Sequence, residues 1–172
     1  MMKRSSNDTG LATITLRRSR ISMDDTVRHE VVQILNGSLA TALDLQTQAK
    51  QAHWNVAGME FFSLHQLFDA VAESAAEAVD LLAERAVQLG GTALGTARLA
   101  AERSILPEYP HELSSGKQHV EALAERVAAF ANHVREAIEK TATLGDQTTA
   151  DIYTEISRAM DKYLWMLEAH LR

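Results

Sequence analysis

The chain has 172 residues, of which 46% are hydrophobic and 23% charged, and its formal net charge is −6. This length suits one domain with a substantial hydrophobic core. The sequence contains no cysteine, which excludes disulfides, thiolate metal sites and cysteine nucleophiles. Any metal ion would therefore be held by histidine and carboxylate side chains, a ligand set that suits iron, manganese or zinc.

The N-terminal segment is basic whereas the rest of the chain is acidic. Residues 1–20 contain five basic residues against one acidic residue, Asp8, so they carry +4 and leave −10 for residues 21–172. A basic arm on an acidic body is typical of contact with a polyanion, although a solvated leader has the same composition. The candidates for nucleic-acid contact are Lys3, Arg4, Arg17, Arg18 and Arg20. The arm lacks the apolar run of a secretory signal, and no segment approaches the ~20 apolar residues of a membrane span, so we expect a cytoplasmic protein.

Apolar residues recur at helical spacing along four long segments, with no strand pattern or internal repeat. We predict long helices over residues 24–52, 60–89, 115–141 and 148–172. Gly90 and Gly91 end the second of these, and a short helix is expected within residues 92–106. Four amphipathic helices of similar length predict an all-α four-helix bundle, with residues 1–22 as a basic arm and residues 23–172 as the bundle.

Histidine and carboxylate side chains gather on one arc of the second predicted helix. With about 100° of rotation per residue, Asp69, Asp80 and Glu84 lie about 40°, 60° and 100° from His65. The pair His65/Asp69 is nevertheless about 22 Å along the axis from the pair Asp80/Glu84, so one helix cannot close a single site. A second antiparallel copy, related by a two-fold axis near residues 74–75, would bring the two pairs together.

Four further observations bear on this hypothesis. His53, at the end of the first helix, is placed to complete the cluster, and the small residues 74–76 would let two helices approach closely. Acidic residues four apart are also typical of a solvated helix face, and Glu73 and Glu77 share this face. The only Glu-x-x-His spacing lies in the proline-containing loop at 108–111, which argues against a di-iron centre within one bundle.

The stretch "HWNVAGMEFFSLHQLFD" at residues 53–69, followed by "VDLLAERAVQLGGTALG" at 79–95, resembles the Dps family. These are the DNA-binding proteins from starved cells, also called mini-ferritins. The similarity covers about residues 28–172 and includes "TTADIYTEISRAMDKYLWMLEAHL" at 148–171. The resemblance implies a ferritin-like four-helix bundle with a short helix in the crossover between helices 2 and 3. It also implies assembly into a hollow homo-oligomeric shell, a dodecamer.

The resemblance further implies that the protein is a ferroxidase. Family members oxidise Fe(II), preferentially with hydrogen peroxide, at two-fold interfaces and store ferric mineral inside the shell. Each centre takes two irons, of which the second is weakly held. Carried over by position, the iron ligands are His53, His65 and Asp69 from one subunit and Asp80 and Glu84 from its mate.

Other family features can be placed on this sequence. The iron-access pore on the three-fold axes would be lined by Asp146, Asp151 and Glu155. The family usually has aspartate at the position of Glu155, and acids at a helix N-terminus that favour the helix dipole are the alternative interpretation. Trp54 resembles the aromatic neighbour of the centre, which either intercepts radicals or packs. The other helical histidines, expected at the surface or in interfaces, are His29, His119, His133 and His170.

Some family members bind DNA without sequence specificity through a basic N-terminus. The arm of this chain is predicted to do so, although its stretch "LATITL" at residues 11–16 also suits folding onto the shell. The expected function is therefore iron storage and peroxide detoxification that protects DNA, in the cytoplasm and at the nucleoid. The alternative is a nucleoid-binding protein whose ferroxidase activity is weak. A plain structural bundle would require the spacing of the five ligand positions to be a coincidence.

Overall fold

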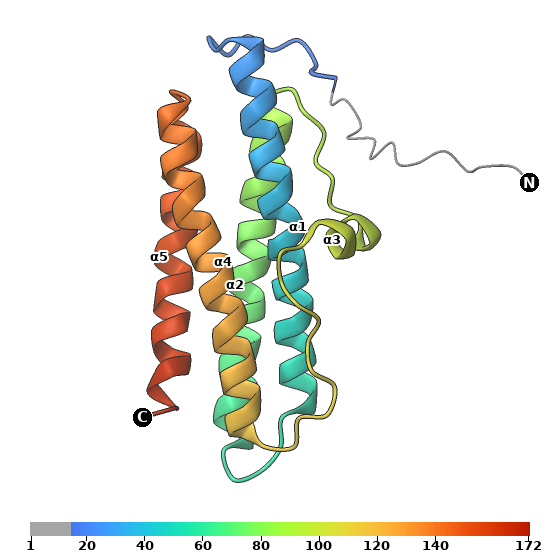
Figure 1. The fold of residues 1–172 in the computed structure, drawn as a ribbon, viewed down its shortest axis with the longest axis vertical. Helices are drawn as coiled ribbons and strands as arrows, with labels where there is room; N and C mark the ends of the chain where they lie inside the picture. The colour runs from blue at the N-terminus through green and yellow to red at the C-terminus, as the bar shows by residue number, and fades with distance from the viewer. Residues whose placement is uncertain (1–14) are drawn as a thin grey trace, which may run out of the picture.

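The computed structural model describes residues 15–172, in which every regular element is an α-helix (Figure 1). Lys3 and Arg4, two of the predicted DNA-binding residues, lie outside the described residues. The helices are α1 (Asp25–Asn55), α2 (Phe61–Gln88), α3 (Ala97–Arg103), α4 (Gly116–Thr143) and α5 (Gln147–Ala169). Within residues 15–172, no helix combines the length and the apolar character needed to cross a membrane. The predicted all-α fold class is confirmed.

The four long helices form two antiparallel pairs, α1 with α2 and α4 with α5. The connection from α2 to α4 runs back along the bundle and carries α3 against α1 (Figure 1). One long crossover between two helical hairpins is the ferritin-like arrangement of a four-helix bundle. The crossover places the C-terminal end of α1 and the N-terminal ends of α2 and α4 at the same end of the molecule (Figure 1).

The helix ends follow from local hydrogen bonding. Ser115 and Gln118 form a capping box at the start of α4, in which each side chain bonds the backbone of the other. The short helix α3 has only seven residues, fewer than the predicted range 92–106. Its start is determined by Thr96, whose side chain accepts a hydrogen bond from the Leu99 N–H, and Ser104 ends it in an extended conformation.

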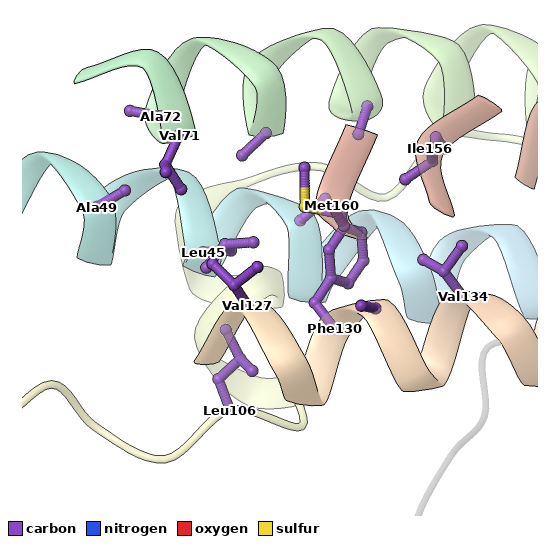
Figure 2. Packing of buried hydrophobic residues seen from close by; sticks show 14 of the residues in the cluster. Leu45, Ala49, Val71, Ala72, Leu106, Val127, Phe130, Val134, Ile156 and Met160 are labelled. Atoms are coloured by element: carbon purple, nitrogen blue, oxygen red, sulfur yellow. The ribbon is translucent and has the colours of Figure 1, made fainter. Parts of the chain in front are cut away.

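The core fills the space between the four long helices. Phe68 of α2, Phe130 of α4 and Tyr153 of α5 are completely buried. Phe130 and Met160 point into this space (Figure 2), and Leu106 brings the crossover into the same cluster. Each fully buried large apolar side chain contributes about 1.5–3 kcal/mol, so this cluster is what holds the two helical pairs together.

The last part of the basic arm is docked on the end of α2. The Arg17 N–H donates to the Gly90 carbonyl at 2.7 Å, and the Arg17 guanidinium donates to the Gly91 carbonyl at 3.1 Å. Arg28, buried in α1, donates to the Leu89 carbonyl at 2.9 Å and to the Arg17 carbonyl at 3.4 Å. These bonds satisfy carbonyl groups that the end of α2 would otherwise leave without partners.

This docking changes the interpretation of the arm. Leu16 packs against the core, so the chain is attached to the bundle from inside the segment 1–22 that was predicted as an arm. Arg17, Arg18 and Arg20 are all exposed, but only the Arg17 guanidinium bonds the end of α2. The alternative in which part of the arm folds onto the body concerns residues 11–16. Of these, Leu16 packs against the bundle, and the bonds of Arg17 extend the contact by one residue.

Substituting Gly90 tests the docking. Gly90 has φ +88°, and a Cβ there would lie 2.5 Å from the Arg17 carbonyl oxygen, whereas Gly145 has φ +87° and open space around it. Both Gly90→Ala and Gly145→Ala should lower the free energy of unfolding by about 1–3 kcal/mol through left-handed backbone strain. Only Gly90→Ala should also release residues 15–20, which trypsin would then cleave faster after Arg17, Arg18 and Arg20. Equal cleavage rates in the two variants would contradict the docking.

Candidate metal centre

His53 and His65 meet where α1 ends and α2 begins. The turn between the two helices passes through Gly58, whose φ of +109° lets the chain reverse direction. The two imidazole rings stack with centroids 3.6 Å apart and planes 20° apart. The His53 Nδ1 lies 2.7 Å from the His65 carbonyl oxygen, and the His65 Nδ1 lies 2.8 Å from the His53 carbonyl oxygen.

These reciprocal bonds determine the tautomer of both rings. A carbonyl oxygen only accepts, so each Nδ1 must carry a hydrogen and donate it. In a neutral imidazole the Nε2 lone pair is then free, which is the form in which histidine binds a metal ion. A carbonyl partner on the other ring nitrogen is also the usual support for a metal-binding histidine. Both histidines are therefore prepared to bind a cation through Nε2.

Asp69 lies one helical turn beyond His65. Its Oδ1 is 3.9 Å from the His53 Nδ1 and accepts a hydrogen bond from the Lys50 Nζ at 2.5 Å. The hydrogen bond from Lys50 is the main cause that lowers the pKa of Asp69. Burial opposes it less strongly, and the nearby charges of His53, Lys50 and His65 add smaller lowering effects. Asp69 is thus an anion at neutral pH. Sequence reasoning missed Lys50, although its position three residues before His53 puts both on one face of α1.

Asp80 and Glu84 are exposed one turn apart on α2. Asp80 is 11 residues beyond Asp69, about 16 Å along the axis. Within residues 15–172, no three histidine, aspartate or glutamate side chains lie close enough together to hold a metal ion. One chain thus offers two incomplete donor sets. The first has two imidazoles and a carboxylate, and the second has two carboxylates. Together these donors fit Fe(II) and Fe(III).

Exposed apolar side chains surround the first donor set. Trp54 is 66% exposed and Phe62 67%, Met59 is fully exposed, and the Phe61 ring lies 5.0 Å from the His65 ring. In the single chain Trp54 therefore does not pack into the core. A cluster of large apolar side chains at the surface is typical of an interface with another molecule.

Residues 74–76 were predicted to let a second helix approach, and their burial in the single chain tests this prediction. Ala75 is completely buried in the core of its own chain, and Ser74 is nearly so. Ala76 is half-buried. The prediction that all three would let a partner helix approach is therefore wrong for Ala75 and Ser74. The reason is that the apolar stripe of α2 faces the bundle at these positions.

Asp146 has a structural position that does not suit the predicted pore. Its carboxylate is 1% exposed, accepts two hydrogen bonds from the Arg85 guanidinium at 2.9 and 3.1 Å, and caps α5 by accepting from the Thr149 N–H at 3.0 Å. The Arg85 Nε also donates to the Thr149 hydroxyl at 2.8 Å. A carboxylate buried inside one chain cannot line a channel between chains, so the alternative interpretation as a helix N-terminal acid applies to Asp146.

The other two predicted pore residues are exposed. Asp151 lies on the surface of α5, and Glu155 lies one turn further along. Glu155 borders a groove of about 450 Å³ between α2 and α5, which Glu77 and Asp80 also line. The groove therefore brings a predicted pore residue and a predicted iron ligand to the same cavity.

The chain is similar to known proteins over most of its length. The ferritin-like domain family matches residues 32–172. The DNA protection during starvation protein of Agrobacterium fabrum is 41% identical over 155 residues, which are 90% of this chain and 96% of that protein. The solved structure of DpsC from Streptomyces coelicolor has a TM-score of 0.87 at 29% identity and covers 92% of both chains. Dps of Mycobacterium smegmatis has a TM-score of 0.86 at 27% identity, over 90% of this chain and 94% of that one.

These matches span nearly the whole described structure and include both donor sets. The chain has the ferritin-like fold. It belongs to the Dps family, which confirms the resemblance seen in the sequence.

The role of Asp146 can be tested against Asp151. Asp146→Ala should lower the free energy of unfolding by about 3–5 kcal/mol, because it leaves the Arg85 charge buried without its partner. Asp151→Ala should change it by no more than about 0.5 kcal/mol, as is usual at exposed positions. Urea unfolding at one fixed protein concentration measures both, since assembly adds to the apparent stability. Similar losses in the two variants would show that Asp146 is not the buried anchor described here.

Proposed function

We propose that this protein oxidises Fe(II) with hydrogen peroxide at centres shared between two copies of the chain. The ligands are His53, His65 and Asp69 of one subunit with Asp80 and Glu84 of its mate. The observation that carries the proposal is the pair of reciprocal histidine–carbonyl bonds, which leave both Nε2 atoms free for a cation. The alternative interpretation, an ordinary solvated face of acidic residues on α2, gives no reason for two histidines to be held in the tautomer that binds metal ions.

The shared centre follows from the position of the donors on α2. An antiparallel copy of α2 would place the exposed carboxylates of Asp80 and Glu84 opposite the histidines of its neighbour. The same contact would cover Trp54 and Phe62, whose burial is worth about 25 cal/mol for each Å² of apolar surface. A single two-fold contact would therefore complete two centres at once and remove the exposed apolar cluster.

The chemistry suits these ligands. Imidazole nitrogen and carboxylate oxygen bind Fe(II), and the carboxylates stabilise the Fe(III) that forms. Two Fe(II) ions transfer two electrons to one hydrogen peroxide, which breaks the O–O bond and yields water without a free hydroxyl radical. Binding of Fe(II) at Asp69 displaces the Lys50 ammonium from that carboxylate. We place the second, weaker iron beside the exposed carboxylates of Asp80 and Glu84.

The oxidised iron would be stored as ferric mineral inside a homo-oligomeric shell, a dodecamer. Asp151 and Glu155 are the exposed carboxylates available for an iron-access pore, and Asp146 anchors the helix that carries them. The negative charge of the body, −10 for residues 21–172, favours the accumulation of iron cations at such an assembly.

Paired substitutions on α2 test the centre. Asp80→Ala with Glu84→Ala should reduce the rate of Fe(II) oxidation by peroxide to near that of a protein-free solution. The matched control, Glu73→Ala with Glu77→Ala, removes the same charge from the same helix and should keep the fast rate. Stopped-flow absorbance of Fe(III) after anaerobic loading measures both. Equal losses in the two pairs would mean that α2 is only a general acidic face, and no loss in either would make the ligand assignment wrong.

We further propose that the protein binds DNA without sequence specificity. Arg18 and Arg20 are exposed beside the docked Arg17, which holds them against the body. Many weakly basic arms on one shell would add their contacts to DNA phosphates through avidity. The name of the Agrobacterium relative refers to DNA protection. A cytoplasmic, nucleoid-associated protein fits both roles. A DNA-binding shell with weak oxidation remains the alternative function.

The docked segment should contribute more to DNA binding than the residues before it. Arg18→Ser with Arg20→Ser removes two charges, whereas deletion of residues 2–14 removes a net charge of only +1. The double substitution should weaken binding more and reduce the slope of log affinity against log salt by about 0.9 for each phosphate that the arm no longer neutralises. Electrophoretic mobility shifts over a salt series measure this, with Arg98→Ser plus Lys117→Ser as the charge-matched control. A larger effect of the deletion would place the DNA-binding residues before residue 15.

A further inference from the structure

Tyr109 and His119 form a hydrogen-bonded pair in the core. Tyr109 lies in the crossover before α4, and its hydroxyl is 2.8 Å from the Nδ1 of His119 on α4. Both residues are 2% exposed. The prediction that His119 lies at the surface or in an interface is therefore wrong. The ring faces the bundle because it precedes Leu123 by four residues on the buried side of α4.

The direction of the hydrogen bond follows from counting partners. The His119 Nε2 is buried and has no hydrogen-bond partner within residues 15–172. If Tyr109 donates to Nδ1, only the Nε2–H is unsatisfied. If Nδ1 donates instead, the tyrosine hydrogen and the Nε2 lone pair are both unsatisfied, and each such buried group costs about 1–3 kcal/mol. Tyr109 is therefore the donor and His119 the acceptor.

Burial keeps both members of this pair uncharged. It lowers the pKa of His119, and it raises the pKa of Tyr109 to about 12 against a smaller opposing effect of Arg126. Tyr109 is thus a neutral phenol at physiological pH. Its hydroxyl proton has one base within hydrogen-bond distance, the Nδ1 of His119.

Arg126 covers the other side of the pair. Its guanidinium lies 5.6 Å from the centroid of the Tyr109 ring. It donates to the Gln48 side chain at 3.0 Å and to the Glu108 carbonyl at 2.9 Å. A fixed positive charge over the ring disfavours a second positive charge on that ring. Any oxidation of Tyr109 therefore requires the phenol proton to leave in the same step.

The pair lies against the helix that carries His65 and Asp69. The His119 ring lies 6.4 Å from the ring of Phe68, and Phe68 immediately precedes Asp69 on α2. His65 is one turn earlier on the same helix, and its ring is stacked on His53. Phe68 therefore contacts the buried pair from within the same turn of α2 that carries His65 and Asp69.

We propose that Tyr109, with His119 as its proton acceptor, is a one-electron donor for peroxide when a centre holds only one Fe(II). This role rests on the proposed iron oxidation. One electron comes from Fe(II) and the other from Tyr109. The O–O bond breaks to give two hydroxide ions, the tyrosine O–H bond breaks, and a new N–H bond forms at Nδ1. The products are Fe(III), a neutral tyrosyl radical and the His119 imidazolium, so the total charge is unchanged and no hydroxyl radical forms.

The first test uses iron and peroxide on the assembled protein. Anaerobic protein loaded with one Fe(II) per centre is mixed with hydrogen peroxide, frozen rapidly and examined by electron paramagnetic resonance. A tyrosyl signal should form in the parent protein and be lost in Tyr109→Phe. The chain has three tyrosines, so Tyr153→Phe and Tyr163→Phe are matched controls that should keep the signal. A signal that survives in Tyr109→Phe and is lost in either control would overturn the proposal.

The second test needs no iron and separates this proposal from the ferroxidase function. Azide radicals made by pulse radiolysis oxidise tryptophan side chains, and the chain has two of them, Trp54 and Trp165. The tryptophan radical absorption should decay into a tyrosyl absorption in the parent protein but not in Tyr109→Phe. Absence of this transfer in the parent overturns the proposal whatever the iron result. Transfer in the parent, together with failure to oxidise Fe(II), would instead reject the proposed iron chemistry and leave Tyr109 as an electron donor.

His119→Gln tests the proton acceptor and replaces the histidine with another side chain that can hydrogen-bond. Tyrosyl formation should become slower, and the g-tensor of the radical should shift because the positively charged partner is lost. Formation in the parent protein should also be slower in deuterium oxide. A radical with an unchanged rate and an unchanged g-tensor in His119→Gln would show that His119 is only a packing residue.

Discussion

The centre depends on the two hydrogen bonds that join the end of α1 to the start of α2. Each histidine ring donates to the carbonyl group of the other residue, so the stacking, the tautomer and the direction of both Nε2 atoms are determined together. The carbonyls at the end of α1 would otherwise need other partners, because a helix leaves its last carbonyls unsatisfied. The same bonds therefore join the two helices of the hairpin and leave the Nε2 atoms of the two proposed ligands available to a cation.

The polar groups at the opposite end of the bundle have a structural role. Arg85 and Asp146 are both buried and join α2 to the start of α5, and Arg28 joins α1 to the end of α2 and to the docked arm. These contacts hold the ends of the long helices. Asp80 and Glu84 are exposed, and their carboxylates make no such contact within residues 15–172. A single helix, α2, therefore carries the anchoring residue Arg85 beside the proposed ligand positions Asp80 and Glu84.

Most of the fold could be predicted from the sequence because the helical periodicity of apolar residues is strong over four long segments. The ends of α3 were predicted poorly, since a short alanine-rich helix is limited by its caps and not by a long apolar stripe. The five candidate ligands could also be named from spacing and resemblance. Periodicity alone could not show that Lys50 bonds Asp69, because this contact depends on how α1 packs against α2.

By itself, the sequence determined the helical bundle, the absence of thiol chemistry and the positions of two donor pairs too far apart on one helix to form one site. Only the tertiary structure decided which polar side chains are free. It placed Asp146 and His119 in the interior and bonded Arg17 to the bundle, although all three read as surface residues in the sequence. The physical reason is that a polar residue can be buried wherever a partner from a distant segment satisfies it. Arg85, Tyr109 and the Gly90–Gly91 turn are those partners, and no local pattern reveals them.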